Sequence, residues 1–363
     1  ETGAGGRAPL LMDIETMSER EVNPFQIGAA DRRELLGELL PFWQGQSLAD
    51  RLEKQLVSSG LYSQDMHDFA MALTGNTSRQ VFMLSSAATV ATIQGHVILD
   101  HERVLRVGLR AMRAEVEERL AASRDDGAGR DFLESVALAL DGVTTFARRL
   151  ADRVARQRDV TRDPRRRAQL EGLAETCRRV PEGPAETFAE AVQALWTVKT
   201  AVEVAHPINL HCFGRLDQIL LPYYEADRAA GRLDRDAARE LLEELLLKVM
   251  SQNIRPESNL LGNFYHRFLG SSPITLAGLR PDGEDGTNDV TYLFLEAAHR
   301  SRAITNVAVR VHPGTPDELL HALAGYLHGG TSCFSLFNDE THVPAMQQRG
   351  FDDQDARDYA LMG

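Results

Sequence analysis

One short stretch decides the fold class: Thr305-Asn306-Val307-Ala308-Val309-Arg310-Val311. Its β-branched residues predict a strand, and a second stretch of this kind, Pro273-Ile274-Thr275-Leu276-Ala277, lies upstream. Residues 288–302, between the two, have the pattern of a helix that begins beside an acidic, glycine-rich turn, and residues 316–328 follow as another helix. Short strands that alternate with helices predict parallel pairing, and therefore an α/β fold.

The chain before these strands is mainly helical. Residues 103–122 and 131–156 carry apolar side chains at helical spacing with charged side chains outward, whereas residues 186–204 are apolar on most faces, as in a buried helix. We therefore predict a helical N-terminal layer that precedes the α/β part. Further helices are expected at residues 31–40, 166–179 and 234–250.

Composition excludes several classes of protein. The 363 residues are 43% hydrophobic and 26% charged, as in soluble globular proteins, and no apolar run approaches the roughly 20 residues that span a bilayer. The net charge of −13 disfavours nucleic acid, because phosphate binding needs a basic face. Cys177, Cys212 and Cys333 are too few for a disulfide framework or a zinc site. We expect a cytoplasmic protein with a small-molecule substrate and no nucleic-acid or membrane partner.

A second informative stretch is Gly214-Arg215-Leu216-Asp217-Gln218, which is followed by Leu221-Pro222-Tyr223-Tyr224. The glycine permits a close approach where the chain enters a helix. Arg215 and Asp217 can hold a loop through charge-assisted hydrogen bonds, and the aromatic residues can pack against it. This stretch is therefore expected to have a structural role.

The chain ends with an apolar run, Tyr359-Ala360-Leu361-Met362, and Gly363. Terminal residues are usually polar, because they make few contacts that offset their ordering entropy. The run is instead typical of a segment that enters a buried core, so we expect the polypeptide to continue beyond it in the parent protein.

Several stretches, taken together in their order and spacing, resemble the glycyl radical enzymes of the pyruvate formate-lyase superfamily. They are residues 23–27, 40–43, 95–96, 104–109, 178–181, 187–196, 214–224, 282–296, 306–310, 329–330, 334–340 and 355–363.

The resemblance implies a single domain fragment over residues 1–363. Residues 17–205 would be its mainly helical part, and residues 206–363 would form the first part of an incomplete ten-stranded α/β barrel. Strands without their partners would leave an exposed edge, so we expect the isolated chain to aggregate or to dimerise through that edge.

The resemblance also implies a radical mechanism. A catalytic cysteine is expected immediately after Gly363, so this chain would contain no catalytic residue and would be inactive alone. A glycyl radical, on the C-terminal part of the parent, would be installed by a radical-S-adenosylmethionine activase, and the chain itself would bind no cofactor. The cysteine's thiyl radical would then take a hydrogen atom from the substrate. The parent is expected to be a homodimer.

The family implies pocket positions but leaves the substrate open. Carbon–heteroatom lyase, dehydratase and formate acetyltransferase-like reactions all remain possible, although the His-Ser pair of glycerol and diol dehydratases falls at Asn209 and Leu210 and is therefore absent. A histidine can serve as an acid or a base, or bond to the backbone nearby. The substrate-pocket candidates are His96, His206, Asn209, His211, Phe213, Phe337 and Asn338.

Other patterns favour structural roles. Asp352, Asp353 and Asp355 could bind magnesium, but a helix N-cap with acidic residues in its first turn explains them better. The histidines after residue 311 lack the spacing of a zinc helix, which disfavours a metal-dependent hydrolase. Cys333 is expected to be a small buried hydrophobe. The alternative to an enzyme is a non-catalytic relative that acts as a binding or assembly scaffold.

Overall fold

The computed structural model describes residues 27–43, 45–46, 51, 54–55, 58–60, 97–123, 127–205, 211–251, 274–303 and 305–361. The chain divides into two compact units, the first of residues 1–95, 207–210 and 251–271, and the second of residues 96–206, 211–250 and 272–363. In the first unit, α1 (Ala29–Glu34), the π-helical turn η2 (Leu35–Leu39) and α2 (Leu40–Trp43) follow one another, and they confirm the helix predicted over residues 31–40.

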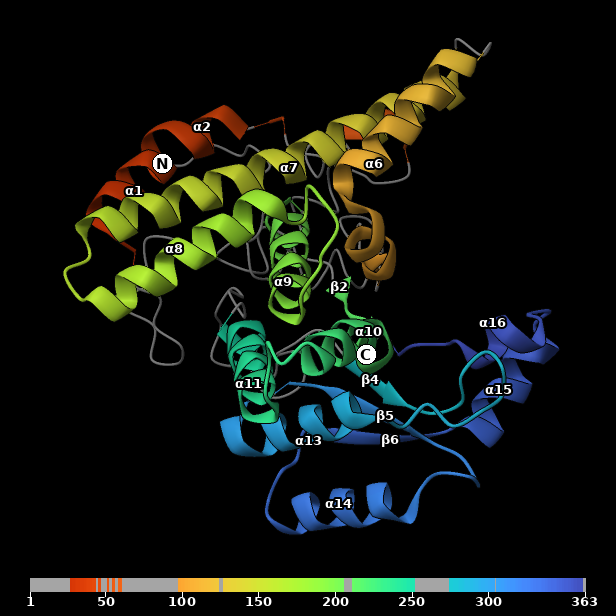
Figure 1. Cartoon of the computed structure of the whole chain (residues 1–363). Helices are drawn as coiled ribbons and strands as arrows, with labels where there is room; N and C mark the ends of the chain where they lie inside the picture. Colours follow the sequence, from red (N-terminus) through yellow and green to blue (C-terminus); the bar gives the residue numbers. More distant parts are fainter. Residues whose placement is uncertain are drawn as a thin grey trace, which may run out of the picture. The chain divides into compact units, whose positions relative to one another are not determined.

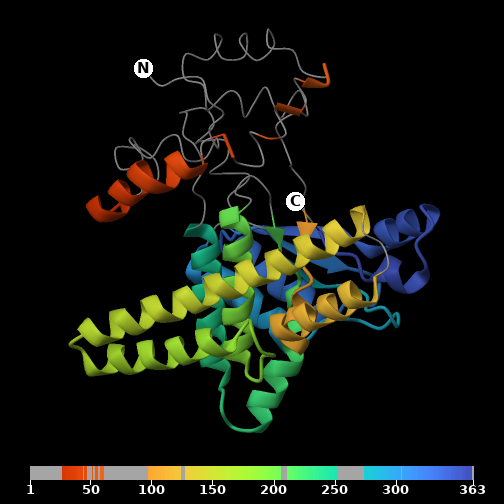
Figure 2. The ribbon, with the colours of Figure 1, turned by 90° about the horizontal axis from the view of Figure 1, so that it is seen from above.

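Long helices open the second unit, and they confirm the predicted helical layer. They are α6 (His101–Ala122), α7 (Ala128–Val160), α8 (Pro164–Arg179) and α9 (Phe188–Ala205). Helices α7 and α8 lie side by side (Figures 1 and 2). A small cluster of Val154, Leu170 and Ala174 is buried in the contact between them.

Helix α6 bends at Gly108, within the helix predicted over residues 103–122. Gly108 has a φ of +75°, and a side chain there would come within 2.5 Å of the backbone carbon of Gly183. The bend allows the N–H group of Leu109 to donate to the carbonyl of Pro181 at 2.9 Å. Only glycine combines this conformation with this close approach, so the bend joins the start of α6 to the loop before α9.

The α/β part of the second unit is a parallel sheet, as predicted. Its strands are β3 (Gly214–Arg215), β4 (Ile274–Ala277), β5 (Val307–Val311) and β6 (Phe334–Asn338), and they lie in the sheet in chain order. The helices between them are α10 (Leu216–Ala229), α11 (Arg235–Ser251), α13 (Asp289–Ser301) and α14 (Asp317–His328). A separate parallel pair joins β1 (Val97–Ile98) to β2 (His211–Cys212).

The two faces of the four-stranded sheet differ in chemistry, because paired residues in neighbouring strands share a face. Ile274, Val307 and Phe334 are in register on one face and belong to the main hydrophobic core, together with residues of α10, α11, α13 and α14. The opposite face, called the polar face below, carries Arg215, Thr275, Ala277, Ala308, Arg310, Ser335 and Phe337.

Strand β6 is the last strand of this sheet in the described part of the chain. Burial decreases along this strand: Phe334 is buried, whereas Leu336, two residues later on the same face, is 54% exposed. Two short helices follow it, α15 (Asp339–Gln348) and α16 (Asp353–Arg357), which lie against each other (Figure 1). The predicted exposed edge and closure into a barrel both stay predictions.

Candidate functional site

Residues 357–361 contact the polar face of the sheet, and neighbouring strands each hold one part of this segment. Arg215 of β3 donates from Nη1 to the Asp358 carboxylate at 2.8 Å. Arg310 of β5 donates to the carbonyl of Tyr359 at 2.9 Å. From β4, the hydroxyl oxygen of Thr275 accepts the N–H of Leu361 at 2.9 Å. Residues 359–361 are half-buried and belong to no strand, and side chains hold this segment rather than a strand ladder. Its entry into a buried core stays a prediction.

Arg310 is the centre of this arrangement. Its guanidinium is fully buried and forms a bidentate ion pair with Asp339, with two nitrogen–oxygen distances of 2.9 Å. It also donates to the carbonyl of Arg357 at 2.7 Å, and its central carbon lies 3.8 Å from the centre of the Tyr359 ring. The Tyr359 hydroxyl donates to Asp339 at 2.6 Å. We call Arg310, Asp339 and Tyr359 the Arg310 clamp.

The protonation of the clamp follows from these contacts. Burial opposes the charge of Asp339, but the hydrogen bonds from Arg310, the Leu279 N–H and Tyr359 outweigh it, and the pKa of Asp339 lies below its usual value. Burial and the bond to Asp339 raise the pKa of Tyr359. At neutral pH the clamp is therefore a carboxylate, a guanidinium and a neutral phenol.

The backbone beside the clamp is strained. Gly278 has a φ of +77°, and a side chain there would meet Arg310 at 2.5 Å. Ala277, immediately before it, has a φ of +57°, which a residue with a side chain rarely adopts. Its N–H is bound by the Asp217 carboxylate at 2.6 Å and its carbonyl by Arg215 at 3.1 Å. Strain of this kind persists only where the surroundings enforce it.

Asp217 holds this strained turn from within the core. Its side chain is fully buried and also accepts the Thr291 hydroxyl at 2.7 Å, and burial raises its pKa. The nearby Gln218 donates to the carbonyl of Gly286 at 2.6 Å. The loop-holding role predicted for Arg215 and Asp217 is thus confirmed.

A second group of buried polar side chains surrounds Phe213. His101, at the start of α6, stacks on the Phe213 ring with centroids 5.6 Å apart, and Lys199 of α9 lies 5.5 Å from the same ring centre. Both ring nitrogens of His101 lack a hydrogen-bond partner, and burial, Lys199 and His211 lower its pKa to about 3. The imidazole is therefore neutral at physiological pH.

The predicted pocket residues fall into two groups where the structure describes them. His211 and Phe213 belong to the buried group around His101, whereas Phe337 and Asn338 lie on β6, with the Phe337 ring 5.7 Å from that of His342. Asn338 caps α15 by accepting the Glu340 N–H at 2.9 Å. The other candidates, His96, His206 and Asn209, lie outside the described residues.

Sequence reasoning did not single out the clamp residues, nor His101 and Lys199 in the second group. Asp339 and Tyr359 lay inside stretches that resembled the family but received no role. A usable signal was present in Arg310, an arginine among β-branched residues, because a buried guanidinium requires a carboxylate partner. The same argument applies to Lys199 on the apolar face of its helix, where Glu203 is its ion-pair partner.

The structure confirms the helix cap predicted at Asp352. Asp352 caps α16 by accepting the Asp355 N–H at 2.8 Å, and the described residues contain no cluster suited to a metal ion. Burial raises the pKa of Cys333 to about 11 and that of Cys212 to about 12, so neither is an activated thiol. Among the described residues, no helix combines the length and apolarity needed to cross a membrane.

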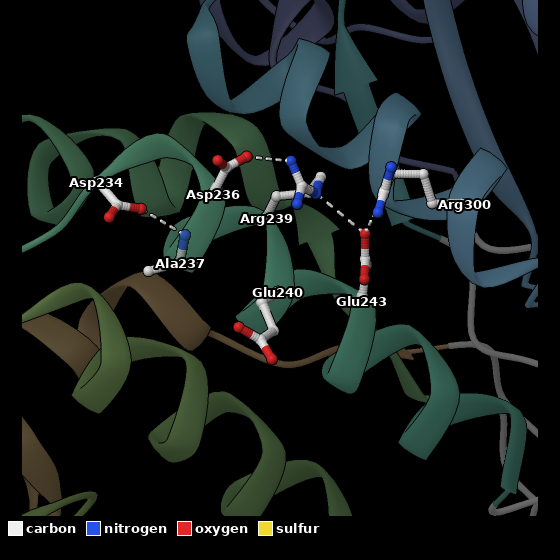
Figure 3. Close-up of a pocket in the computed structure, with 7 residues that line it drawn as sticks. All are labelled: Asp234, Asp236, Ala237, Arg239, Glu240, Glu243 and Arg300. Atoms are coloured by element: carbon white, nitrogen blue, oxygen red, sulfur yellow. Dashed lines mark hydrogen bonds and ion pairs between the residues drawn. The ribbon is translucent and has the colours of Figure 1, made fainter.

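A charged surface pocket lies away from the clamp, at the contact of α11 with α13 (Figure 3). Arg239 pairs there with Asp236 and with Glu243, and Arg300 pairs with Glu243 at 2.9 Å. Both arginines of the pocket are thus engaged in ion pairs, and the acidic side chains of its lining outnumber them. Its lining is Asp234, Asp236, Ala237, Arg239, Glu240, Glu243 and Arg300.

Comparison with known proteins gives consistent matches. The model of the pyruvate formate lyase-like family matches residues 6–363. Isethionate sulfite-lyase of Nitratidesulfovibrio vulgaris is 31% identical over 360 residues, which are 96% of this chain and 42% of that protein. The glycerol-bound B12-independent glycerol dehydratase of Clostridium butyricum superposes with a TM-score of 0.76 at 25% identity, over 98% of this chain and 43% of that one. A glycyl radical enzyme of Archaeoglobus fulgidus superposes with a TM-score of 0.73 at 26% identity, over 97% of this chain and 44% of that one. The chain thus spans less than half the length of these relatives.

Proposed function

Because this chain belongs to the pyruvate formate lyase-like family, we propose that it is the N-terminal portion of a glycyl radical enzyme. The reaction would cleave a carbon–heteroatom bond of a small organic substrate, as a lyase or a dehydratase. The names of the relatives support this class, since they include a sulfite-lyase and a glycerol dehydratase. A formate acetyltransferase-like reaction is the less supported form of the same chemistry.

One observation carries the proposal: residues 357–361 are held on the polar face of the parallel sheet, opposite its apolar core. We expect the four strands to belong to the ten-stranded barrel, with the polar face inward. The apolar face, packed on helices, would then exclude water from the site.

The chemistry would need groups that follow this chain in the parent protein. A glycyl radical and a cysteine expected directly after Gly363 would together supply the abstraction of a hydrogen atom from a substrate carbon. The carbon–heteroatom bond would then break, and the S–H group would return the hydrogen atom to the product. The cycle needs no net oxidant or reductant.

The residues of this chain would bind and orient. The Arg310 clamp would hold the segment that leads to the cysteine, and the pocket would be lined by His211, Phe213 and Phe337 together with the other predicted positions. We propose that the chain binds no cofactor, that a radical-S-adenosylmethionine activase is the partner, and that the parent is a homodimer.

The test is anaerobic activation of the full-length protein with its activase. We expect an oxygen-sensitive glycyl radical by electron paramagnetic resonance, followed by turnover of isethionate, with release of sulfite, or by dehydration of glycerol. The 363-residue chain alone should form no radical under the same treatment. A full-length protein that forms no radical would refute the enzyme and favour a binding or assembly scaffold.

A further inference from the structure

We propose that the Arg310 clamp is a positioning device that sets the register of residues 357–361 on the polar face, and thereby places the residues after Leu361. The inference rests on the proposed function, because only a reactive group further along the chain needs such placement. It assigns a role to Arg310, Asp339 and Tyr359 that is separate from substrate binding.

The first argument is what the guanidinium recognises. Arg310 donates to the carbonyls of Arg357 and Tyr359, so it binds the backbone of the segment at two points. The guanidinium is planar, and its donors have a fixed geometry. Its orientation is set in turn by the bidentate pair with Asp339. The two carbonyls are therefore fixed relative to β5 and to the start of α15.

The second argument is that the side chain of Tyr359 is held by several contacts. Its hydroxyl donates to Asp339 at 2.6 Å, while its ring stacks against the Arg310 guanidinium and against the His342 imidazole, whose centroid is 5.3 Å away. A slip of the segment by one residue would replace Tyr359 with Asp358 or Ala360, and neither side chain can make these contacts. The clamp therefore accepts one register.

The third argument is the cost of any other arrangement. Displacement of the segment would deprive the buried Arg310 side chain of the carbonyls of Arg357 and Tyr359, and a buried donor without an acceptor is destabilising. Asp358 and Leu361, on either side of Tyr359, are held by Arg215 and Thr275, so the flanks cannot swing freely. Since a displacement of about 1 Å can slow a reaction about 100-fold, the clamp is suited to control the chemical step.

The experiment compares Arg310→Lys and Tyr359→Phe with the wild type in the full-length protein, and uses Arg239→Lys in the surface pocket as the matched control. Lysine keeps the charge but loses the planar set of donors, whereas phenylalanine keeps the ring but loses the hydroxyl. In the activated enzyme, we expect kcat to fall about 100-fold for Arg310→Lys and about 3- to 10-fold for Tyr359→Phe. KM should stay within about threefold, and the glycyl radical yield should not change. The control should match the wild type.

Amide hydrogen exchange of the unactivated full-length protein is the second measurement, and it is independent of the proposed activity. Both clamp variants should speed exchange selectively in the peptide that contains residues 357–361. If the wild type forms no radical, the proposed function is refuted but the clamp is not, because amide exchange still tests the clamp. Unchanged exchange in that peptide would overturn the inference. An unchanged kcat in an active Tyr359→Phe enzyme would also overturn it. The same holds if kcat falls only in variants whose whole fold is destabilised.

Discussion

The Arg310 clamp and the surface pocket of Figure 3 are built from the same kinds of side chain and differ in their access to water. In the clamp, Arg310 and Asp339 are both fully buried. In the pocket, the side chains of Arg239 and Glu243 are 15% and 23% exposed, and that of Asp236 is 80% exposed. Water can replace a lost partner at the surface but not in the core. An ion pair therefore fixes a structure only where water is excluded.

The largest effect is expected for Arg310→Met, which leaves the Asp339 carboxylate buried without its cation. We expect the free energy of unfolding to fall by about 3–5 kcal/mol, the usual cost of breaking a buried pair from one side. Urea unfolding, followed by circular dichroism, would measure it. If the free energy of unfolding falls by less than about 1 kcal/mol, as for a surface ion pair, burial does not distinguish the clamp from the surface pocket.

Gly278→Ala tests how tightly the clamp is enclosed. The new methyl group would meet Arg310 at 2.5 Å and would also force a positive φ on alanine, so we expect a loss of about 2–4 kcal/mol. Gly231→Ala is the matched control, because Gly231 also has a positive φ, of +68°, but open space around it. Its expected loss is about 1 kcal/mol. If thermal unfolding gives equal losses for the two variants, the Arg310 side chain can move aside for the new methyl group at little cost.

His101 extends the comparison to a buried group that has no hydrogen-bond partner on either ring nitrogen. Its folded-state pKa of about 3 lies below that of an unfolded histidine, near 6.5. Between these two pKa values the unfolded chain binds a proton at His101 and the folded chain does not. The contribution of His101 to stability is therefore complete above pH 6.5 and is lost as the pH falls towards 3. Between pH 7 and pH 4 we expect a loss of about 3 kcal/mol from this residue.

The variant His101→Phe keeps the stack on Phe213 and removes the titration. Unfolding free energies measured from pH 7 to pH 4 should therefore decline less steeply for the variant than for the wild type. Parallel curves would mean that the imidazole becomes protonated within the fold, for example by approach of the Glu203 carboxylate that now pairs with Lys199.

The smallest effect is expected for Arg239→Ala. This substitution removes ion pairs that water partly screens, so the free energy of unfolding should fall by less than about 1 kcal/mol, and by less still in 1 M salt. Chemical unfolding at low and high salt would measure both values. A loss comparable to that of Arg310→Met would contradict the argument from burial.

Much of the fold could be predicted because local patterns encode it. The β-branched residues of β5, the cap of α13 at Asn288 and the apolar face of α9 are short-range signals, and each element formed where the pattern placed it. The parallel pairing followed from the alternation of strands and helices.

The clamp could not be predicted in the same way, because its contacts join distant parts of the chain. Arg215 and Asp358 are 143 residues apart, and Arg310 and Tyr359 are 49 apart. The sequence shows that Arg310 needs a carboxylate, but many acidic residues could supply it. The choice of Asp339 depends on the register of β5 against β6, which places Arg310 beside Phe337 near the end of the last strand.

The order of the strands has a consequence for how the molecule is assembled. Each parallel strand can pair with the one before it as soon as the intervening helix has formed, so the sheet can grow in the direction of synthesis. Residues 357–361 are different, because their partners come from β3, β4, β5 and the residue after β6. Their binding surface does not exist until all four strands are in place. We therefore expect this segment to dock only after these four strands have paired.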